Sequence, residues 1–248
     1  MTDMENRMIL RCKNISFQYE RGRNTLTECS FDMPKGGRLG LIGCNGAGKS
    51  TLLKIITGLL KADGGSAEVD GREVCKANLA EIRKTAGFVF QEAENQLFMP
   101  TVAEDVAFGP FNYGVRGGEL EQTVTAVLES LGIEKLGERR ITRLSGGEKK
   151  LVSLATVLAL NPKLLILDEP TIALDPGNRR RLINILKGLS QAQLIASHDL
   201  DMIWDTCDEV IFMTEGRIAA HGFAKEILAD RELLEANGLE LPLRLQGG

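Results

Sequence analysis

A glycine-rich segment carries the residue types that bind phosphate, and it reads Gly43-Cys44-Asn45-Gly46-Ala47-Gly48-Lys49-Ser50. It fits G-x-x-x-x-G-K-[ST], in which the glycines let the backbone curl so that successive N–H groups point at phosphate oxygens. A helix is expected directly after the loop, and its positive end attracts anions further. Lys49 is expected to reach the β- and γ-phosphates, and Ser50 to ligate Mg²⁺.

Two acids end an apolar run in the segment Leu164-Leu165-Ile166-Leu167-Asp168-Glu169. A strand of a parallel sheet is buried on both faces, so its carboxylates appear where it emerges at the ligand edge of the sheet. Asp168 is expected to hold Mg²⁺ directly or through water, and Glu169 to polarise the attacking water as general base. A charged strand exit is common by itself, but downstream of a phosphate-binding loop it favours nucleotide chemistry.

A third segment, Leu144-Ser145-Gly146-Gly147-Glu148, precedes an apolar helix expected over residues 149–160. Ser145 and Glu148 fit the S-x-x-E capping box of a helix N-terminus. Two glycines in a first turn cost about 1 kcal/mol each relative to alanine, which is an odd choice for capping alone. Bare glycines and a serine hydroxyl at a helix N-terminus leave a flat surface rich in hydrogen-bond donors, which suits an anion.

The composition is that of an ordinary globular protein, with 248 residues of which 43% are apolar and 26% charged. It excludes a disordered chain, a collagen and a coiled coil. At ~150 residues per domain, the length allows roughly one to two domains. The 34 acidic and 30 basic residues give a net charge of −4, and aromatic residues are few. This balance argues against a nucleic-acid partner, which usually needs a basic excess and stacking side chains.

Sequence patterns also argue against a membrane span, a disulfide framework and a zinc site. The longest apolar stretch, Leu151 to Leu160, has ten residues and two polar interruptions. A spanning helix needs about 20. The first residues contain acids and Asn where a signal peptide needs an apolar run, so a cytosolic chain is expected. The five cysteines are scattered and there are only two histidines, so isolated reduced thiols are the expectation.

The elements that position these segments alternate between strands and helices. Apolar patterns predict strands around residues 15–19, 27–33, 38–43 and 86–90, a short strand between turns at 63–65 and 70–71, and strands at 164–167, 193–196 and 210–213. Helices are predicted after Lys49, between residues 92 and 160, and between the later strands. This order implies an α/β fold with a mostly parallel sheet. The early strands look antiparallel and the middle helices look like an insertion.

Taken together, these segments resemble the ATP-binding-cassette (ABC) ATPase family over roughly residues 8–225. The family's parts occur in order along the chain: Tyr19 as the aromatic that stacks on adenine, Gly43 to Thr51 as the P-loop, Gln91 as the Q-loop glutamine, Ser145 to Glu148 in the signature, Asp168 and Glu169 as the Walker B acids, Asp175 in the D-loop and His198 as the switch histidine. Two departures stand out: Glu148 replaces the commoner Gln, and Leu151 stands where a basic residue often follows.

The resemblance implies a P-loop NTPase fold with an N-terminal antiparallel β subdomain and an inserted helical subdomain. The ATP-binding domain is expected over residues 8–242, its helical insertion over about 92–160, and a C-terminal helical tail over 223–248. ATP and Mg²⁺ are the implied cofactors. Two copies, identical or not, are expected to pair head to tail, with the signature of one closing over ATP on the other. Glu169 is then expected to activate water, His198 to contact the γ-phosphate, and Gln91 to touch Mg²⁺ and water.

A finer resemblance lies in residues 88–98, 100–110 and 233–243, which are similar to energy-coupling-factor (ECF) transporter ATPases of the cobalt and nickel importer type. It implies an ATP-hydrolysing importer subunit that is peripheral on the cytoplasmic face of the membrane. Its partners would be integral membrane coupling and substrate-binding components, and the segment after the Q-loop would form the groove that receives the coupling helices of the membrane subunit. An ECF vitamin importer or another ABC transporter remains an alternative.

Two further classes are less favoured. Soluble ABC ATPases of translation or DNA repair usually carry two cassettes or a long coiled-coil insertion, and the sequence has neither. An unrelated P-loop kinase or GTPase would not need the signature segment, and no N-K-x-D guanine motif occurs.

Overall fold

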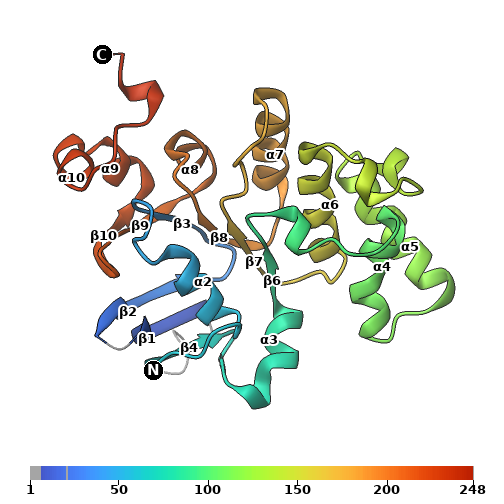
Figure 1. The fold of residues 1–248 in the computed structure, drawn as a ribbon, viewed down its shortest axis with the longest axis horizontal. Coiled ribbons are helices and arrows are strands. Elements are labelled where there is room, and N and C mark those ends of the chain that lie inside the picture. Colours follow the sequence, from blue (N-terminus) through green and yellow to red (C-terminus); the bar gives the residue numbers. More distant parts are fainter. Residues whose placement is uncertain (1–6, 21, 248) are drawn as a thin grey trace.

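A computed structural model describes residues 7–20 and 22–247 of the chain. Two β-sheets lie one above the other, and a group of helices extends from one edge of the larger sheet (Figure 1). The predicted α/β fold, with an antiparallel β subdomain and an inserted helical subdomain, is confirmed.

The smaller sheet is antiparallel and has the strand order β2-β1-β4-β5. Its strands are β1 (Met8–Glu20), β2 (Arg23–Pro34), β4 (Gly64–Val69) and β5 (Arg72–Glu73). Asp70 and Gly71, with φ of 47° and 76°, form the predicted turn between β4 and β5. The turn predicted at residues 63–65 is partly wrong, because Gly64 already pairs with Ser16 in the ladder between β4 and β1.

The larger sheet has the order β10-β9-β3-β8-β7-β6. Its strands are β3 (Arg38–Ile42), β6 (Ala86–Val89), β7 (Leu164–Asp168), β8 (Ala192–Ala196), β9 (Glu209–Thr214) and β10 (Arg217–Phe223). All pairs except β9–β10 are parallel. The sequence did not predict β10, because this half-exposed edge strand lacks an apolar run. A turn at Glu215 and Gly216, with φ of 47° and 74°, folds it back on β9.

Apolar side chains form a core on each face of the parallel sheet. In β7, Leu164 and Ile166 point into the core shared with the antiparallel sheet and α2 (Lys49–Ile56). Leu165 and Leu167 point into the opposite core, which includes side chains of α7 (Pro176–Gly188) and α8 (Leu200–Thr206). The strand is therefore buried on both faces, and its carboxyl end is where polar side chains become available.

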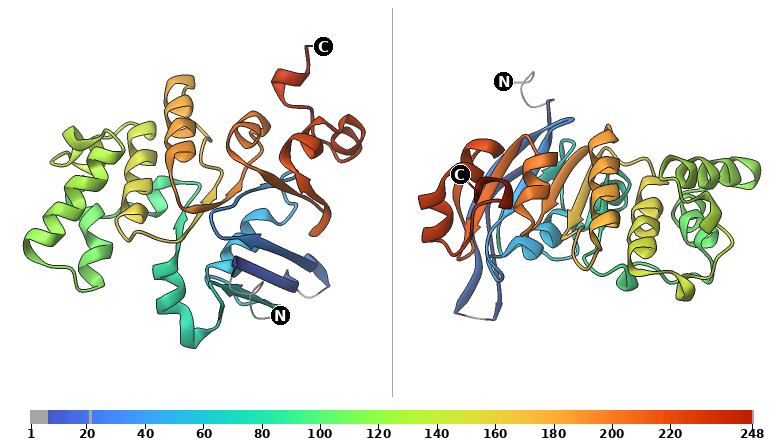
Figure 2. Two further views of the ribbon diagram at one scale, coloured as in Figure 1. Left: turned by 180° about the vertical axis from the view of Figure 1, so that it is seen from behind. Right: turned by 90° about the horizontal axis from the view of Figure 1, so that it is seen from above.

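The chain between β6 and β7 forms the helical group seen in green and yellow (Figures 1 and 2). It contains α4 (Val102–Asn112), α5 (Gly117–Ser130), α6 (Gly146–Leu158) and the short turns Ala93–Asn95, Glu134–Leu136 and Ile141–Arg143. In α5, Val124 and Leu128 are buried, and Gly132 follows with φ of 62°. One face of α5 is thus packed into the core, and the left-handed Gly132 follows shortly after its end.

The remaining helices are short. A 3-10 turn (Lys76–Asn78) and α3 (Leu79–Thr85) precede β6. After β10 come α9 (Ala224–Ala229), α10 (Arg231–Ala236) and a 3-10 turn at Leu243–Leu245. Gly248, the last residue of the expected tail, lies outside the described residues. Over the described ranges, no helix is both long and apolar enough to cross a bilayer.

Candidate active site

The glycine-rich loop connects β3 to α2 and depends on conformations that favour glycine. Gly43, Gly46 and Gly48 have φ of 146°, 83° and 99°. A Cβ on Gly43 would lie 2.2 Å from the carbonyl oxygen of Met213, and one on Gly48 would lie 2.7 Å from the side chain of Leu26. The spacing of glycines in this loop is therefore imposed by both backbone conformation and close packing.

Lys49 lies inside the curl of this loop. Its side chain is buried, and Nζ donates to the carbonyl oxygens of Gly43 at 2.7 Å and Cys44 at 3.2 Å. Burial lowers the pKa of Lys49, while the carboxylates of Glu169 and Asp168 oppose that shift. The loop and the acids thus hold an ammonium group where the phosphates of a nucleotide are expected.

Ser50 and Asp168 meet across a long separation in sequence. Ser50 Oγ donates to Asp168 Oδ1 at 3.1 Å, because the start of α2 faces the carboxyl end of β7. Burial raises the pKa of Asp168, the bond from Ser50 lowers it, and the neighbouring Glu169 raises it. A hydroxyl beside a carboxylate supplies the hard oxygen ligands that Mg²⁺ prefers, so these two residues fit the metal that the sequence implied.

Glu169 and His198 form a second pair at the same edge of the sheet. They follow the adjacent strands β7 and β8, and His198 Nδ1 lies 2.7 Å from Glu169 Oε2. The same carboxylate oxygen accepts from Ser197 Oγ and from the His198 N–H, each at 3.2 Å. Glu169 is buried and has φ of 46°, which is uncommon for a non-glycine residue. Neighbouring groups thus fix the position of the carboxylate.

One cavity of about 570 Å³ gathers most of the predicted residues: Gly43 to Thr51, Gln91, Glu169 and His198 line it, together with Ile172, Gly238 and Leu239. Tyr19 lies beside it, since its hydroxyl is 3.3 Å from Thr51 Oγ1. The Tyr19 side chain is 59% exposed, so one face is accessible to a ligand. The arrangement can hold a nucleotide and place a carboxylate near its phosphates.

The signature and Asp175 do not line this cavity. Ser145 and Glu148 form the predicted capping box, with Glu148 N–H donating to Ser145 Oγ at 3.3 Å and Ser145 N–H to Glu148 Oε2 at 2.8 Å. Asp175 caps α7 and bonds the Asn178 side chain. A Cβ on Gly147 would lie 2.5 Å from that Asn178 side chain, so Gly147 permits close packing of α6 on α7, whereas Gly146 has open space around it.

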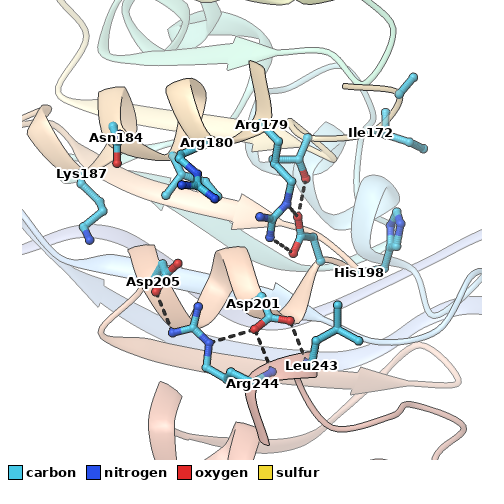
Figure 3. A pocket seen from close by; sticks show the side chains of 14 residues that line it. Ile172, Arg179, Arg180, Asn184, Lys187, His198, Asp201, Asp205, Leu243 and Arg244 are labelled. Atoms are coloured by element: carbon cyan, nitrogen blue, oxygen red, sulfur yellow. Dashed lines mark hydrogen bonds and ion pairs between the residues drawn. The ribbon is translucent and has the colours of Figure 1, made fainter. Parts of the chain in front are cut away.

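A larger groove of about 770 Å³ adjoins the cavity between α7, α8 and the C-terminal segment, and Ile172 and His198 line both (Figure 3). In it, Arg179 makes two bonds to Asp199, from Nε at 2.5 Å and from Nη2 at 2.6 Å. Burial alone would raise the pKa of Asp199, but the bonds from Arg179 and from the Met202 N–H hold it below its usual range. This ion pair holds Asp199, the residue after His198, against α7.

Replacing Arg179 with Met is expected to lower the free energy of unfolding at neutral pH by about 1–2 kcal/mol, because charged hydrogen bonds to Asp199 are lost from a partly exposed pair. The folded-state pKa of Asp199 is lowered, so the contribution of the pair is complete above the unfolded value of ~3.9. It is lost as the pH falls through the folded value. Urea unfolding at neutral and at acidic pH checks this, and the deficit should shrink in acid.

Arg180→Met is the matched control, because Arg180 is the exposed neighbour of Arg179 on the same helix. Its effect should stay within about 0.5 kcal/mol at both pH values. An Arg179 deficit that is equally large in acid would contradict the assigned role of the ion pair.

Sequence reasoning missed Lys150, whose Nζ donates to the main-chain oxygens of Phe90 at 3.0 Å and Gln91 at 2.7 Å. Burial lowers the pKa of Lys150 to about 8, although the Asp168, Glu94 and Glu169 carboxylates oppose this shift. The sequence did contain a signal for the burial of Lys150. This residue lies three residues after Gly147 and four before Leu154, which is the helical spacing that puts all three on the buried face of α6.

It also missed the contribution of the C-terminal segment to the cavity. Cys44 Sγ donates to the carbonyl oxygen of Asn237 at 3.1 Å, and Gly238 lines the cavity. Further on, the Leu243 N–H and Arg244 Nε each bond Asp201 at 2.8 Å (Figure 3). No local sequence motif predicts these contacts, because they depend on how the C-terminal segment folds back over α8.

Comparison with known proteins gives a consistent assignment. The sequence model of the ABC transporter family matches residues 26–172. An ABC transporter ATP-binding protein of Gloeobacter violaceus is 46% identical over 94% of this chain and 96% of its own. The energy-coupling factor transporter ATP-binding protein EcfA of Methanocaldococcus jannaschii is 38% identical over 94% of this chain and 86% of its own.

Solved structures agree with these relatives. CbiO1 of Clostridium perfringens, part of the ABC transporter complex CbiONQ, superposes with a TM-score of 0.83 and 35% identity, covering 93% of this chain and 94% of that one. A dimeric ATP-binding cassette in a post-hydrolysis state, bound to ADP and Pi, has a TM-score of 0.78 and 26% identity, covering 87% of this chain and 98% of that one.

Proposed function

This chain belongs to the ABC transporter family, and from that premise we propose that it is the ATP-hydrolysing subunit of an ECF-type importer that takes up cobalt or nickel ions. Members of the family bind and hydrolyse ATP and act as dimers with membrane subunits. The ECF type is the finer part of the proposal. It is supported by the likeness to EcfA and to CbiO1 and by the residues that the sequence shares with ECF ATPases.

The observation that carries the catalytic assignment is the placement of the Glu169–His198 pair beside Lys49 and the Ser50–Asp168 pair. Mg²⁺, held by Ser50, Asp168 and Gln91 when bound, supplies positive charge for the phosphates. Lys49 and the loop N–H groups bind the β- and γ-phosphates, and Tyr19 stacks on adenine. These groups supply the positioning and electrostatic stabilisation on which phosphoryl transfer depends.

The remaining polar groups of the site act in the hydrolytic step. Glu169 takes a proton from water as the water oxygen attacks the γ-phosphorus, and the bond to the bridging oxygen breaks to give ADP and phosphate. Ser197 and His198 keep the Glu169 carboxylate in place. The His198 side chain is 55% exposed, which leaves its Nε2 accessible to a γ-phosphate oxygen.

A second ATPase copy completes the site in this proposal. Ser145, Gly146, Gly147, Glu148 and Asp175 do not line the cavity of their own chain. The open space around Gly146 and the capped N-terminus of α6 give a surface that can face the phosphates of a partner. The pair can consist of two copies of this chain or of this chain and a related one.

An exposed aromatic patch on the helical group is the proposed contact for the membrane subunits. This docking patch consists of Phe98, Phe108, Phe111 and Tyr113, which are 63%, 42%, 47% and 42% exposed. The Phe98 and Phe108 rings meet edge to face, with centroids 4.8 Å apart. Exposed apolar side chains that meet, as the Phe98 and Phe108 rings do, mark interaction sites, and aromatic residues are enriched in them. Through this contact the chain would lie on the cytoplasmic face of the membrane without spanning it. The acidic charge balance of the chain favours no nucleic-acid partner.

Replacing both Phe98 and Phe108 with Ser is expected to reduce recovery of the integral membrane subunits by ~10-fold or more when the complex is purified from membranes, because central aromatic contacts dominate such interfaces. ATP binding by the variant should not change, since the patch is not part of the cavity. Mass spectrometry of the purified complex, together with cobalt, nickel and vitamin uptake by membrane vesicles, tests both the partner and the solute.

Phe223→Ser is the matched control, because Phe223 is also 63% exposed but belongs to β10. Full recovery of the membrane subunits with the double variant would contradict the docking patch. Uptake of a vitamin with no response to cobalt or nickel would contradict the proposed solute.

A further inference from the structure

The loop after β6, residues 90–96, is attached to the signature helix α6 by several side chains. Gln96 Nε2 donates to the carbonyl oxygen of Ser153 at 2.6 Å and to Thr156 Oγ1 at 2.8 Å. At the surface, Lys149 Nζ lies 2.8 Å from Glu94 Oε1. Lys150 adds the two bonds to the main-chain oxygens of Phe90 and Gln91.

Lys150 differs from the other attachments in its burial and chemistry. Its side chain is only 4% exposed, and the two oxygens it bonds belong to neutral peptide groups. Burying an ammonium group without a carboxylate directly against it is unfavourable. A methionine of similar length would avoid that desolvation cost but would leave both carbonyl oxygens without this donor, so what the lysine adds here is an attachment of the Phe90 and Gln91 main chain to α6.

Lys150 lies between the signature and the nucleotide cavity, which are the two places where the proposed function puts contacts with ATP. Ser145, the N-cap of α6, lies five residues before Lys150, which is about 7.5 Å along a helix. Gln91, whose carbonyl oxygen accepts a hydrogen bond from Lys150 Nζ, lines the nucleotide cavity of its own chain. The docking patch begins at Phe98, shortly after the same loop.

We propose that Lys150 is a positioning residue that joins the main chain of Gln91 to the signature helix, so that α6 and this loop move together when the signature contacts nucleotide. The proposal rests on the function proposed above for Gln91 and the signature. Its physical basis is that hydrogen bonds from one ammonium group to two consecutive carbonyls fix both the distance and the orientation of the Gln91 peptide.

The test follows amide hydrogen exchange in full-length protein with and without ATP, in Glu169→Gln backgrounds with and without Lys150→Met. With Lys150 present, ATP should slow exchange both at the N-terminus of α6 and in residues 90–96. With Lys150→Met, we expect ATP to slow exchange only at α6. In the background with Glu169 intact, Lys150→Met should reduce kcat roughly 10- to 100-fold while the KM for ATP changes less than about threefold.

Lys149→Met is the control, because Lys149 joins the same helix to the same loop from the surface. It should keep both the exchange response and kcat within about twofold of the original values. If Lys150→Met does not fold, Lys150→Gln replaces it, since an amide can still donate to one of the two carbonyls. Because one of the two bonds remains, the loss of response in residues 90–96 should then be partial, and an undiminished response would overturn the proposal.

An unchanged ATP response of residues 90–96 in the Lys150 variant would overturn the proposal, as would a kcat within twofold of the original. Equal loss of response in the Lys149 and Lys150 variants would also overturn it. Failure of the proposed function itself looks different, because ATP would then leave the exchange of α6 unchanged even with Lys150 in place.

Discussion

Glu169→Gln is expected to leave ATP binding intact while reducing kcat by about 10²- to 10⁴-fold, the usual contribution of a general base. A glutamine amide oxygen can still accept from Ser197 Oγ and the His198 N–H, so the local structure should persist. It cannot take the proton from the attacking water. The nucleotide-bound dimer should therefore accumulate.

Steady-state ATPase rates and light scattering during size-exclusion chromatography with ATP measure these two outcomes. Glu209→Gln is a matched control, because Glu209 Oε2 also pairs with a histidine, lying 3.0 Å from His221 Nε2 on the β9–β10 hairpin. That variant should hydrolyse ATP at the original rate. An ATPase rate in Glu169→Gln close to the original would rule out Glu169 as the general base.

Lys49→Ala is expected to raise the Kd for ATP about 100-fold, which corresponds to about 3 kcal/mol of lost charge-assisted hydrogen bonding to the phosphates. Nζ now bonds the carbonyl oxygens of Gly43 and Cys44, so the substitution also loosens the loop that donates to the phosphates. Titration calorimetry measures the affinity directly. The increase in Tm caused by ATP should also nearly disappear, because that increase depends on the Kd.

Lys61→Ala is the control for charge, since Lys61 is an exposed lysine shortly after α2 and does not line the cavity. Its affinity for ATP should match that of the original protein. Unchanged ATP affinity in Lys49→Ala would contradict the assignment of residues 43–51 as the phosphate-binding loop. A melting temperature measured without ATP shows whether the variant is folded.

Local sequence patterns were sufficient for the elements that carry the site. The apolar run from Leu164 to Leu167 predicted a doubly buried strand, and alternate residues of β7 do enter opposite cores. The capping box at Ser145 and Glu148 was predicted from spacing and is confirmed. Such features depend on neighbours within a few residues, so the chain encodes them where they occur.

Contacts between distant segments were less visible in the sequence. Nothing in the residues around Gly147 predicted that its close neighbour would be the Asn178 side chain on α7. The edge strand β10 was absent from the prediction because its pattern is weak and its pairing with β9 supplies the order. Neither fact can be read from a short window of sequence.

The sequence alone determined the glycine-rich loop between β3 and α2, the two acids at the carboxyl end of β7, the order of the family's motifs and the α/β fold. Only the tertiary structure decided that Glu169 and His198 share a hydrogen bond, that Lys150 bonds the Gln91 main chain, and that Gly238 lines the same cavity as the glycine-rich loop. The physical reason is one of range. Backbone conformation, capping and burial follow from nearby residues, whereas a hydrogen bond between side chains from different elements depends on how the sheet orders its strands and how helices pack on it.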